Sequence, residues 1–448
     1  MPDSERNRLT RRLTRYARVG ANVGGVAARI ASRRLFGLDP DRDQDAAALA
    51  AALGGLKGPI MKVAQLLATI PEALPAEYAA ELGQLQSQAP PMGWPFVRRR
   101  MSVELGPGWE AKFKSFEREA SAAASLGQVH RAQAKSGQLL ACKLQYPDMA
   151  SAVEADLAQL RLIFSIYRRM DRAIDPSEMA DEIGARLREE LDYEREAAHI
   201  HLYRNVLKER PHIHVPKVVD TLSTKRLLTM SWEEGRPILD FKSHGLEERN
   251  TIARHLFQAW WHPFSHFGVI HGDPHLGNYT VRDNLEINLL DYGCIRAFKP
   301  KFVQGVIDLY HAMERDDREL AVHAYETWGF SGLQKEVIET LNIWARFIYA
   351  PLLDDRVRTI ADGVEPGAYG RKEAVEVHKR LSQRGPVKPP REFVFMDRAA
   401  IGLGGVFLHL AAELNFYQLF NGEIANFELK TVAKRQAEAF NAARVPLP

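Results

Sequence analysis

The spacing of hydrophobic and polar residues divides the chain into stretches of different character. Helical spacing, with apolar residues three and four apart, recurs in several stretches. These are residues 96–106, 150–172, 177–208, 247–268 and most of the chain after Pro300. Shorter runs that alternate or stay apolar are typical of strands. They are residues 113–119, 126–135, 138–147, 214–220 and 226–232. We therefore predict an α+β chain in which a strand-rich part with inserted helices precedes a large helical part.

Breaks in this pattern set the predicted domain boundaries. The sequence EEG at 233–235 is interpreted as a hinge between the strand-rich part and the helical part. The layout predicts a basic segment, a helical extension, a small strand-rich lobe and a large helical lobe. They occupy residues 1–44, 45–111, 112–235 and 236–448.

Composition limits the class of protein. The 448 residues are 46% hydrophobic and 26% charged, which is ordinary for a soluble globular chain. Cys142 and Cys294 are the only cysteines, so a disulfide framework is excluded and a reducing compartment is expected. The longest apolar runs are far shorter than the roughly 20 residues that span a bilayer. The first residues also lack the apolar core of a secretory signal. We expect a cytoplasmic protein without a transmembrane helix.

The net charge of +3 is unevenly distributed along the chain. Residues 1–36 hold nine Arg against two acidic residues, and the rest of the chain carries a slight negative excess. Such a segment suits anionic lipid headgroups, which would place the protein peripherally at the inner face of a membrane. The alternative is a solvated helix that packs its apolar stripe on the body of the protein. No aromatic-interleaved basic patch or recognised module indicates nucleic-acid binding.

A polar loop, HGDPHLGN at 271–278, follows the apolar run FGVI. Asn278 lies five residues after Asp273, and Asp291 follows the apolar run INLL. The residues between them, 279–290, are typical of a β-hairpin. Two paired strands would carry Asn278 and Asp291 to the same end of that hairpin.

Phosphoryl transfer requires this combination of side chains. It needs one carboxylate near the attacking oxygen and a pair of hard oxygen ligands for Mg²⁺. Asp273 fits the first role, and Asn278 and Asp291 fit the second. His271 is predicted to hold the loop backbone in shape, and Gly293 to let the chain turn sharply past the metal. The alternative is a connector in which Asp and Asn only cap turns.

A nucleotide site also needs a cation for the phosphates and a loop that covers them. Lys143 lies within the apolar run LLACKLQ, and a buried ammonium needs an acidic partner. The stretch EELDYEREA at 189–197 offers several acids, which the sequence alone does not rank. Upstream, a strand–loop–strand pattern carries alanines where kinases usually carry glycines, so the loop should be stiffer and present fewer amides. The residues of this loop are Ala122, Ala123, Ala124, Ser125 and Gly127.

Five motifs in this order resemble the UbiB/ADCK family, the aarF-domain atypical kinases linked to ubiquinone biosynthesis. They are EASAAASLGQVH, ACKLQYP, EELDYEREA, HGDPHLGN and LLDYG. The resemblance implies a protein-kinase-like bilobal fold with an N-terminal helical extension, and ATP or ADP with Mg²⁺ as cofactors. It also implies quinone-biosynthesis proteins or precursors as partners at a membrane surface.

The resemblance assigns residues that spacing alone leaves open. It makes Glu196 the helix acid that pairs with Lys143, and it matches Glu190 and Asp192 to the family's Glu-x-Asp motif. It also implies that the alanine-rich loop replaces the glycine loop as a feature of the family.

The resemblance further assigns a gating motif near the N-terminus. MKVAQLL matches the family's Lys-x-Gly-Gln motif, which gives Lys62 and Gln65 on a helix that limits access of substrate. Ala64 stands where the family has glycine. Alanine strengthens the helix but prevents the closest approach of another backbone.

Three functions fit these residues. The first is an ATP-binding, ATP-hydrolysing kinase-like protein that acts near membranes in isoprenoid-quinone lipid metabolism. The second is a small-molecule phosphotransferase of the aminoglycoside or choline kinase type, and the third is a catalytically silent scaffold that binds nucleotide or lipid. Ordinary protein kinase activity is not expected, because a helix begins near Lys301 and no activation segment with an Ala-Pro-Glu signature follows Asp291. An exposed apolar face on the helical tail would allow a homodimer.

Overall fold

The structure is a computed structural model of the chain that describes residues 92–448 apart from short gaps. The gaps are Ser125, 171–176, Gly332, 365–369, 371–376 and 378–389. The described residues divide into two compact units. The first unit runs to Glu194 and also contains Val218–Trp232, and the second contains Arg195–Lys217 and Glu233–Pro448. The basic segment at 1–44, and the predicted helical extension as far as residue 91, lie outside the described residues.

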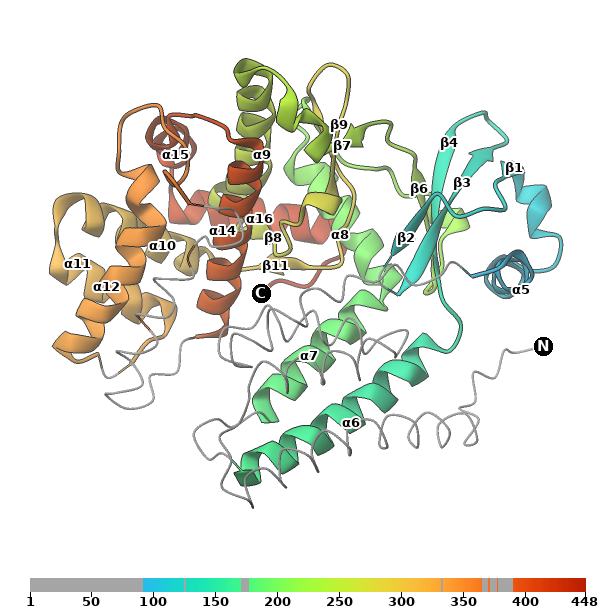
Figure 1. The fold of residues 1–448 in the computed structure, drawn as a ribbon, viewed down its shortest axis with the longest axis horizontal. Coiled ribbons are helices and arrows are strands. Elements are labelled where there is room, and N and C mark those ends of the chain that lie inside the picture. The colour runs from blue at the N-terminus through green and yellow to red at the C-terminus, as the bar shows by residue number, and fades with distance from the viewer. Residues whose placement is uncertain are drawn as a thin grey trace. The chain divides into compact units, whose positions relative to one another are not determined.

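An antiparallel sheet forms the centre of the first unit (Figure 1). Its central strands β3 and β4 pair with each other, β1 and β2 pair with β3, and β6 pairs with β4. The strands are β1 (Phe113–Phe116), β2 (Ala122–Ala124), β3 (Gly127–Ala134), β4 (Leu139–Gln145) and β6 (Leu227–Ser231). β1, β3, β4 and β6 fall within stretches where the sequence predicts a strand, whereas β2 lies in the alanine-rich stretch for which the sequence predicts a loop.

The helix α5 (Trp94–Leu105) contributes to the core of this unit. Its buried side chains Val97 and Met101 belong to one hydrophobic cluster with Trp109 and with apolar residues of β1, β3, β4 and β6. The helix ends at Gly106, whose φ of 89° lies in the left-handed region that glycine tolerates. The predicted helix at 96–106 is confirmed.

The helical stretch that follows β4 differs from the prediction in one respect. In place of one helix over 177–208 there are two, α7 (Ser177–Glu190) and α8 (Tyr193–Val206), and α7 packs beside α6 (Met149–Met170) (Figure 1). At the break, Leu191 N–H donates to a carbonyl three residues back, which tightens the turn. The Gln145 amide donates to Leu191 O at 3.1 Å, so that carbonyl is satisfied outside the helix.

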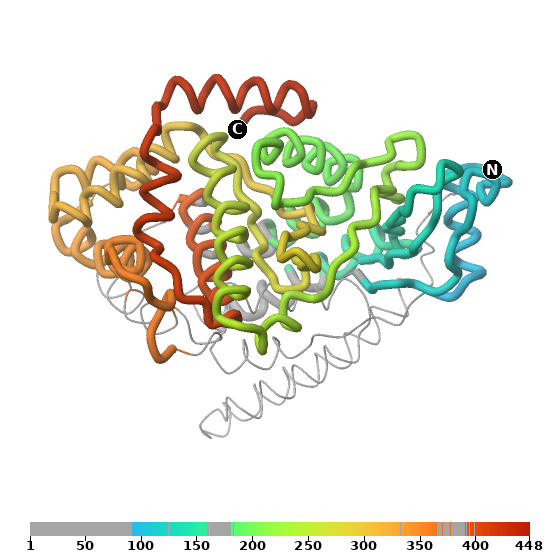
Figure 2. Tube along the Cα trace, turned by 90° about the horizontal axis from the view of Figure 1, so that it is seen from above, coloured from blue at the N-terminus to red at the C-terminus, as the bar shows by residue number. Residues whose placement is uncertain are grey.

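Helices dominate the second unit. α9 contacts α10, α14, α15 and the C-terminal helix α16 (Figure 2). The helices are α9 (Leu246–Phe267), α10 (Pro300–Arg315), α11 (Arg318–Trp328), α12 (Lys335–Tyr349), α14 (Arg391–Leu410), α15 (Phe416–Ile424) and α16 (Leu429–Ala443). In the part of the chain that the structure describes, none of the helices has the length and apolar character to span a membrane.

Two small sheets of the second unit carry the loops of interest. β9 pairs with β10 and β7, β10 also pairs in parallel with β5, and β8 pairs with β11. These strands are β5 (Ile213–His214), β7 (Arg236–Pro237), β8 (Val269–His271), β9 (Tyr279–Val281), β10 (Ile287–Leu289) and β11 (Ile295–Ala297). Short 3-10 turns complete the two units: Trp109–Lys112, Asp220–Leu222, Ile238–Ser243, Leu276–Asn278 and Ala350–Leu352.

The predicted strand at 214–220 is mostly wrong. Within this stretch only His214 belongs to a strand, β5, and Val218 forms an isolated bridge with Met230 of β6. Pro216 interrupts the run, and proline has no N–H to donate to a ladder. The α+β class and the order of strand-rich and helical parts are as predicted.

Candidate nucleotide and metal site

The hairpin of β9 and β10 brings Asn278 and Asp291 to one end, as its sequence predicts. Tyr279 lies opposite Leu289 in the antiparallel pair, and Leu290 N–H donates to Asn278 O at 3.0 Å. Asn278 therefore precedes one strand at the point where Asp291 follows the other.

Hydrogen bonds orient the two side chains that would hold a metal. Asn278 Nδ2 donates to Asp273 O at 2.9 Å, so Asn278 Oδ1 points away from that carbonyl. Asp291 Oδ1 accepts from Gly293 N–H at 2.9 Å, which fixes the plane of the carboxylate. An amide oxygen and a carboxylate are hard donors of the kind that Mg²⁺ prefers. The donor set of this end of the hairpin therefore fits Mg²⁺.

His271 joins the loop of Asp273 to the loop of Asp291. Its Nε2–H donates to Asp291 O at 2.6 Å, and its Nδ1 accepts from Asp273 N–H at 3.4 Å. A carbonyl oxygen only accepts, so a proton is assigned to Nε2, and Nδ1 is the acceptor. His271 is 3% exposed, so it lies beneath the loops and holds their backbones.

Gly272 is required by a close approach of two backbones. Its N–H donates to Cys294 O at 2.8 Å, and a Cβ at this position would lie 2.6 Å from that oxygen. Gly293, by contrast, does not adopt a positive φ. The expectation that glycine is needed there for a sharp turn is therefore wrong: the turn is made by the Asp291 side chain, which accepts from Gly293 N–H.

Two buried tyrosines surround these loops. Burial raises the pKa of Tyr279, and the negative charge of the exposed Asp273 raises it further. Burial likewise raises the pKa of Tyr292 well above its usual value. Both phenols therefore stay neutral, and the Tyr292 hydroxyl donates to Leu289 O at 3.1 Å.

The alanine-rich residues lie in the first unit and form a hairpin strand. Ala122, Ala123 and Ala124 of β2 lie opposite Val129, Gln128 and Gly127 of β3. Ala122 and Ala123 are exposed, and Ser125 lies outside the described residues. Because this stretch pairs with β3, some of its amides already have strand partners.

Lys143 lies in β4 of the same unit. Its Nζ lies 5.3 Å from the centre of the Tyr193 ring, which is a cation–π distance. Gly127 is also here, where a Cβ would come within 2.5 Å of Leu144 O. Lysine, tyrosine and glycine thus meet at the end of the β3–β4 pair.

The acidic residues are divided between the units. Glu190 ends α7 and Asp192 lies in the break before α8, both partly buried in the first unit. Glu196 of α8 is 2% exposed and belongs to the second unit. Its pairing with Lys143 stays a prediction, and Lys62 and Gln65 lie outside the described residues.

The second unit contains a charged cluster that the sequence does not predict. His262 Nδ1 and His266 Nε2 each lie 3.4 Å from Glu423 Oε2, and these three residues form a group that could hold a metal ion. Arg210 Nη2, however, lies 3.0 Å from His262 Nδ1 and 3.1 Å from Glu423 Oε1. Arg435 Nη1 approaches His266 Nδ1 at 3.3 Å. Guanidinium groups repel a cation, so the cluster is a charge network.

This network joins elements that are remote in sequence. Burial alone would raise the pKa of Glu423, but hydrogen bonds from His262 and His266 and the charge of Arg210 lower it to about 2. The i, i+4 spacing of the histidines is visible in the sequence, whereas nothing there indicates Glu423.

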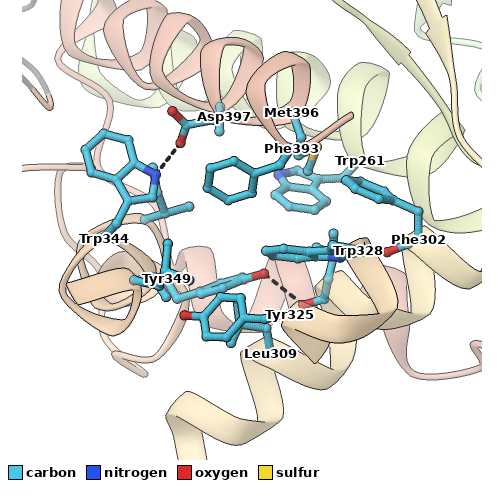
Figure 3. A pocket seen from close by; sticks show the side chains of 15 residues that line it. Trp261, Phe302, Leu309, Tyr325, Trp328, Trp344, Tyr349, Phe393, Met396 and Asp397 are labelled. Carbon is cyan, nitrogen blue, oxygen red and sulfur yellow. Dashed lines mark hydrogen bonds between the residues drawn. The ribbon is translucent and has the colours of Figure 1, made fainter. Parts of the chain in front are cut away.

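An apolar cavity of about 50 Å³ lies among α9, α10, α11, α12 and α14 (Figure 3). Aromatic side chains such as Trp261, Trp328 and Phe393 line it, and the Trp344 indole donates to Asp397 at one side. None of the predicted site residues lines this cavity. An apolar lining does not suit a triphosphate, so the cavity belongs to the helical core.

Comparison with known proteins decides the family. A profile described as the ABC1 atypical kinase-like domain matches residues 84–324, more than half of the chain. The chain belongs to this family. The resemblance based on five motifs is thereby confirmed, because relatives named COQ8 are among the ABC1 chain's matches.

Two curated relatives show the extent of the similarity. The ABC1 chain is 27% identical over 342 residues to "Atypical kinase COQ8, mitochondrial" of Saccharomyces cerevisiae, a match that covers 74% of this chain and 68% of the yeast protein. It is 31% identical over 280 residues to "Protein ACTIVITY OF BC1 COMPLEX KINASE 8, chloroplastic" of Arabidopsis thaliana, covering 60% of this chain. That match spans only 36% of the plant protein.

A solved structure supports the same conclusion about the fold. The complex structure of Rv3197 with erythromycin from Mycobacterium tuberculosis matches the ABC1 chain with a TM-score of 0.60 and 26% identity. The match covers 90% of this chain and 97% of the mycobacterial chain. The predicted α+β, protein-kinase-like fold is confirmed.

Proposed function

We propose that this ABC1-family chain binds ATP with Mg²⁺ and uses it for hydrolysis or phosphoryl transfer. One observation carries the proposal: the hairpin brings Asn278 and Asp291 together, and His271 ties them to the loop of Asp273. When bound, Mg²⁺ would neutralise charge on the phosphates. Asn278 and Asp291 would hold the ion, and the exposed Asp273 would accept a proton from the attacking hydroxyl.

The segment after the metal loop supports a small acceptor or water rather than a docked protein. Only residues 294–299 separate Gly293 from α10, and β11 within them pairs with β8. Ordinary protein kinases bind peptides along an activation segment at this point. A chain that proceeds directly into a strand and a helix offers no comparable platform.

The relatives and the charge of the N-terminal segment support a role in lipid metabolism. The yeast relative is named as a mitochondrial atypical kinase COQ8, and the five motifs resemble the UbiB/ADCK family, which is linked to ubiquinone biosynthesis. Residues 1–36 carry nine Arg, which suits an anionic membrane surface. We therefore propose that the chain supports isoprenoid-quinone or related lipid metabolism, peripherally at a membrane.

The first experiment measures nucleotide binding and ATP turnover of the full chain against Mg²⁺ concentration. In Asp291→Asn the amide oxygen still accepts from Gly293 N–H, so folding should be retained. Loss of the charge should weaken Mg²⁺-dependent binding at least about tenfold. Asp283→Asn, at the exposed other end of the hairpin, is the matched control and should behave as wild type. Unchanged binding in Asp291→Asn would remove the metal assignment.

The second experiment separates the candidate acceptors. Turnover is measured with anionic liposomes, with quinone-like phenols and with soluble alcohols. Stimulation by liposomes and phenols supports the lipid role, and phosphate transfer to an alcohol supports the small-molecule phosphotransferase. The mycobacterial relative was solved with erythromycin, so that macrolide is included as a soluble alcohol. Absence of turnover in the wild-type chain under all of these conditions would leave only the catalytically silent scaffold.

The third experiment tests the basic segment. Deletion of residues 1–36 removes a net charge of +7 and should weaken binding to anionic vesicles, with the largest effect at low salt. Undiminished binding would assign the segment to packing on the protein.

A further inference from the structure

One face of α8 is directed at the turn that carries Asp291. Arg195, His199 and Tyr203 follow one another at intervals of four residues, which places them on the same side of the helix. All three contact the turn or the residues beside it, and all belong to the second unit.

The contacts involve successive carbonyl groups. Asp291 O accepts from His271 Nε2–H at 2.6 Å, and Tyr292 O accepts from His199 Nδ1–H at 3.0 Å. Gly293 O accepts from Arg195 Nη1 at 3.3 Å. Three donors, two of them from α8, therefore hold three consecutive peptide groups of the turn.

Because these contacts are buried, they restrict rotation of the turn. His199 is 5% exposed and the Tyr292 side chain is fully buried. The Tyr203 ring meets the Tyr292 ring edge-on, with centroids 5.5 Å apart. A buried carbonyl that loses its donor costs free energy, so the turn cannot rotate without breaking contacts to α8.

The turn also fixes the orientation of the Asp291 carboxylate. Asp291 Oδ1 accepts from Gly293 N–H at 2.9 Å, so the side chain follows any rotation of the Tyr292–Gly293 peptide. His199 holds the carbonyl of that same peptide, and Arg195 holds the carbonyl of the peptide that follows it. The direction of the carboxylate thus depends on the position of α8.

We propose that Arg195 and His199 are positioning residues that aim Asp291 at its divalent ion, so that a displacement of α8 changes the affinity of the site for Mg²⁺. The inference rests on the proposed function, because it presupposes that Asp291 is a metal ligand. It assigns α8 a regulatory influence over the metal, in addition to the pairing that the family predicts for Glu196.

The test compares three variants of the full chain. His199→Leu keeps the volume but removes the donor, whereas His199→Asn keeps an N–H donor. His201→Leu is the matched control, because a rotation of about 200° along the helix places His201 on a different side. The Mg²⁺ dependence of binding is measured with a fluorescent ATP analogue, and binding without Mg²⁺ is measured in EDTA. Amide exchange at Gly293 is followed in parallel.

We expect His199→Leu to raise the half-saturating Mg²⁺ concentration about tenfold, with unchanged binding in EDTA and about tenfold faster exchange at Gly293. His199→Asn should recover much of both effects. In an Asp291→Asn background, His199→Leu should cause no further loss of Mg²⁺ dependence.

The outcomes separate the inference from the proposed function. Wild-type Mg²⁺ dependence in His199→Leu, or an equal loss in the Asp291→Asn background, would overturn the positioning role. Wild-type protein that shows no Mg²⁺-dependent binding would overturn the proposed function. In that case accelerated exchange in His199→Leu would still establish that α8 holds the turn, and unchanged exchange would refute it.

Discussion

Substitution of Glu423 by glutamine should destabilise the second unit by about 3 kcal/mol at pH 7. The Glu423 side chain is 8% exposed, and its pKa falls from 4.5 to about 2 through His262, His266 and Arg210. That difference corresponds to about 3 kcal/mol. Removal of one partner from a buried ion pair costs a similar amount. Such a loss lowers the midpoint of thermal unfolding by about 6–12 °C in a unit of this size.

The stabilisation by Glu423 depends on pH, and the direction of this dependence follows from its lowered pKa. A carboxyl group with a lowered pKa in the folded state stabilises the protein above pH 4.5, and this contribution is lost as the pH falls toward 2. The free energies of unfolding of wild type and Glu423→Gln should therefore converge in that window. Burial lowers the pKa of His262, so both proteins also lose stability as the pH falls below 6.5.

Urea unfolding followed by tryptophan fluorescence suits this measurement, because Trp261 packs against Phe420 of α15 with ring centroids 4.7 Å apart. Glu438→Gln is the matched control. Glu438 is 66% exposed and lies 4.0 Å from Lys434, so its removal should cost less than about 0.5 kcal/mol. A Glu423→Gln protein within 0.5 kcal/mol of wild type at pH 7 would refute the reasoning, as would a difference at pH 2.5 that is as large as the one at pH 7.

Three further substitutions or reactions follow from single contacts. Tyr203→Phe should raise the free energy of unfolding by about 1 kcal/mol, because the fully buried hydroxyl has no hydrogen-bond partner among the described residues; a loss of stability in thermal unfolding would contradict this. Gly272→Ala should destabilise the protein by about 1–3 kcal/mol and reduce ATP turnover, because its Cβ would lie 2.6 Å from Cys294 O; full turnover would disprove the need for close approach. Burial raises the pKa of Cys142 to about 12, so a thiol reagent at pH 8 should modify at most one cysteine until denaturant is added. Reaction of both thiols in the native chain would exclude a buried Cys142.

Local sequence patterns predicted helices and strands correctly where the pattern of apolar residues alone determines the secondary structure. Alternation predicted β3 and helical spacing predicted α9, because each pattern reflects a single buried face, whereas a continuous apolar run predicted β4, which is buried at successive residues. Two of the failures are sites where a second influence acts. The predicted helix 177–208 breaks where Gln145, remote in sequence, takes the Leu191 carbonyl. The predicted strand 214–220 is interrupted by Pro216, which lacks the N–H that a ladder needs.

In the candidate site, too, contacts between residues close in sequence could be predicted, whereas contacts between residues remote in sequence could not. Asn278 and Asp291 could be placed together because the hairpin that joins them is continuous in sequence. His199 and Arg195 could not be assigned to the turn, because no local pattern states which face of α8 meets which carbonyl. The position of Glu423 beside the two histidines could not be predicted for the same reason.

The short connection between Gly293 and α10 has a consequence for inhibitor design. Compounds that inactivate an enzyme by flipping a metal-binding turn need slack chain after it to take up the movement. Here the Cys294 carbonyl is bonded to Gly272 N–H, and β11 is paired with β8 before the helix begins. Under the proposed function, inhibitors of this chain should therefore be sought among molecules that compete with the nucleotide in the turn's existing geometry.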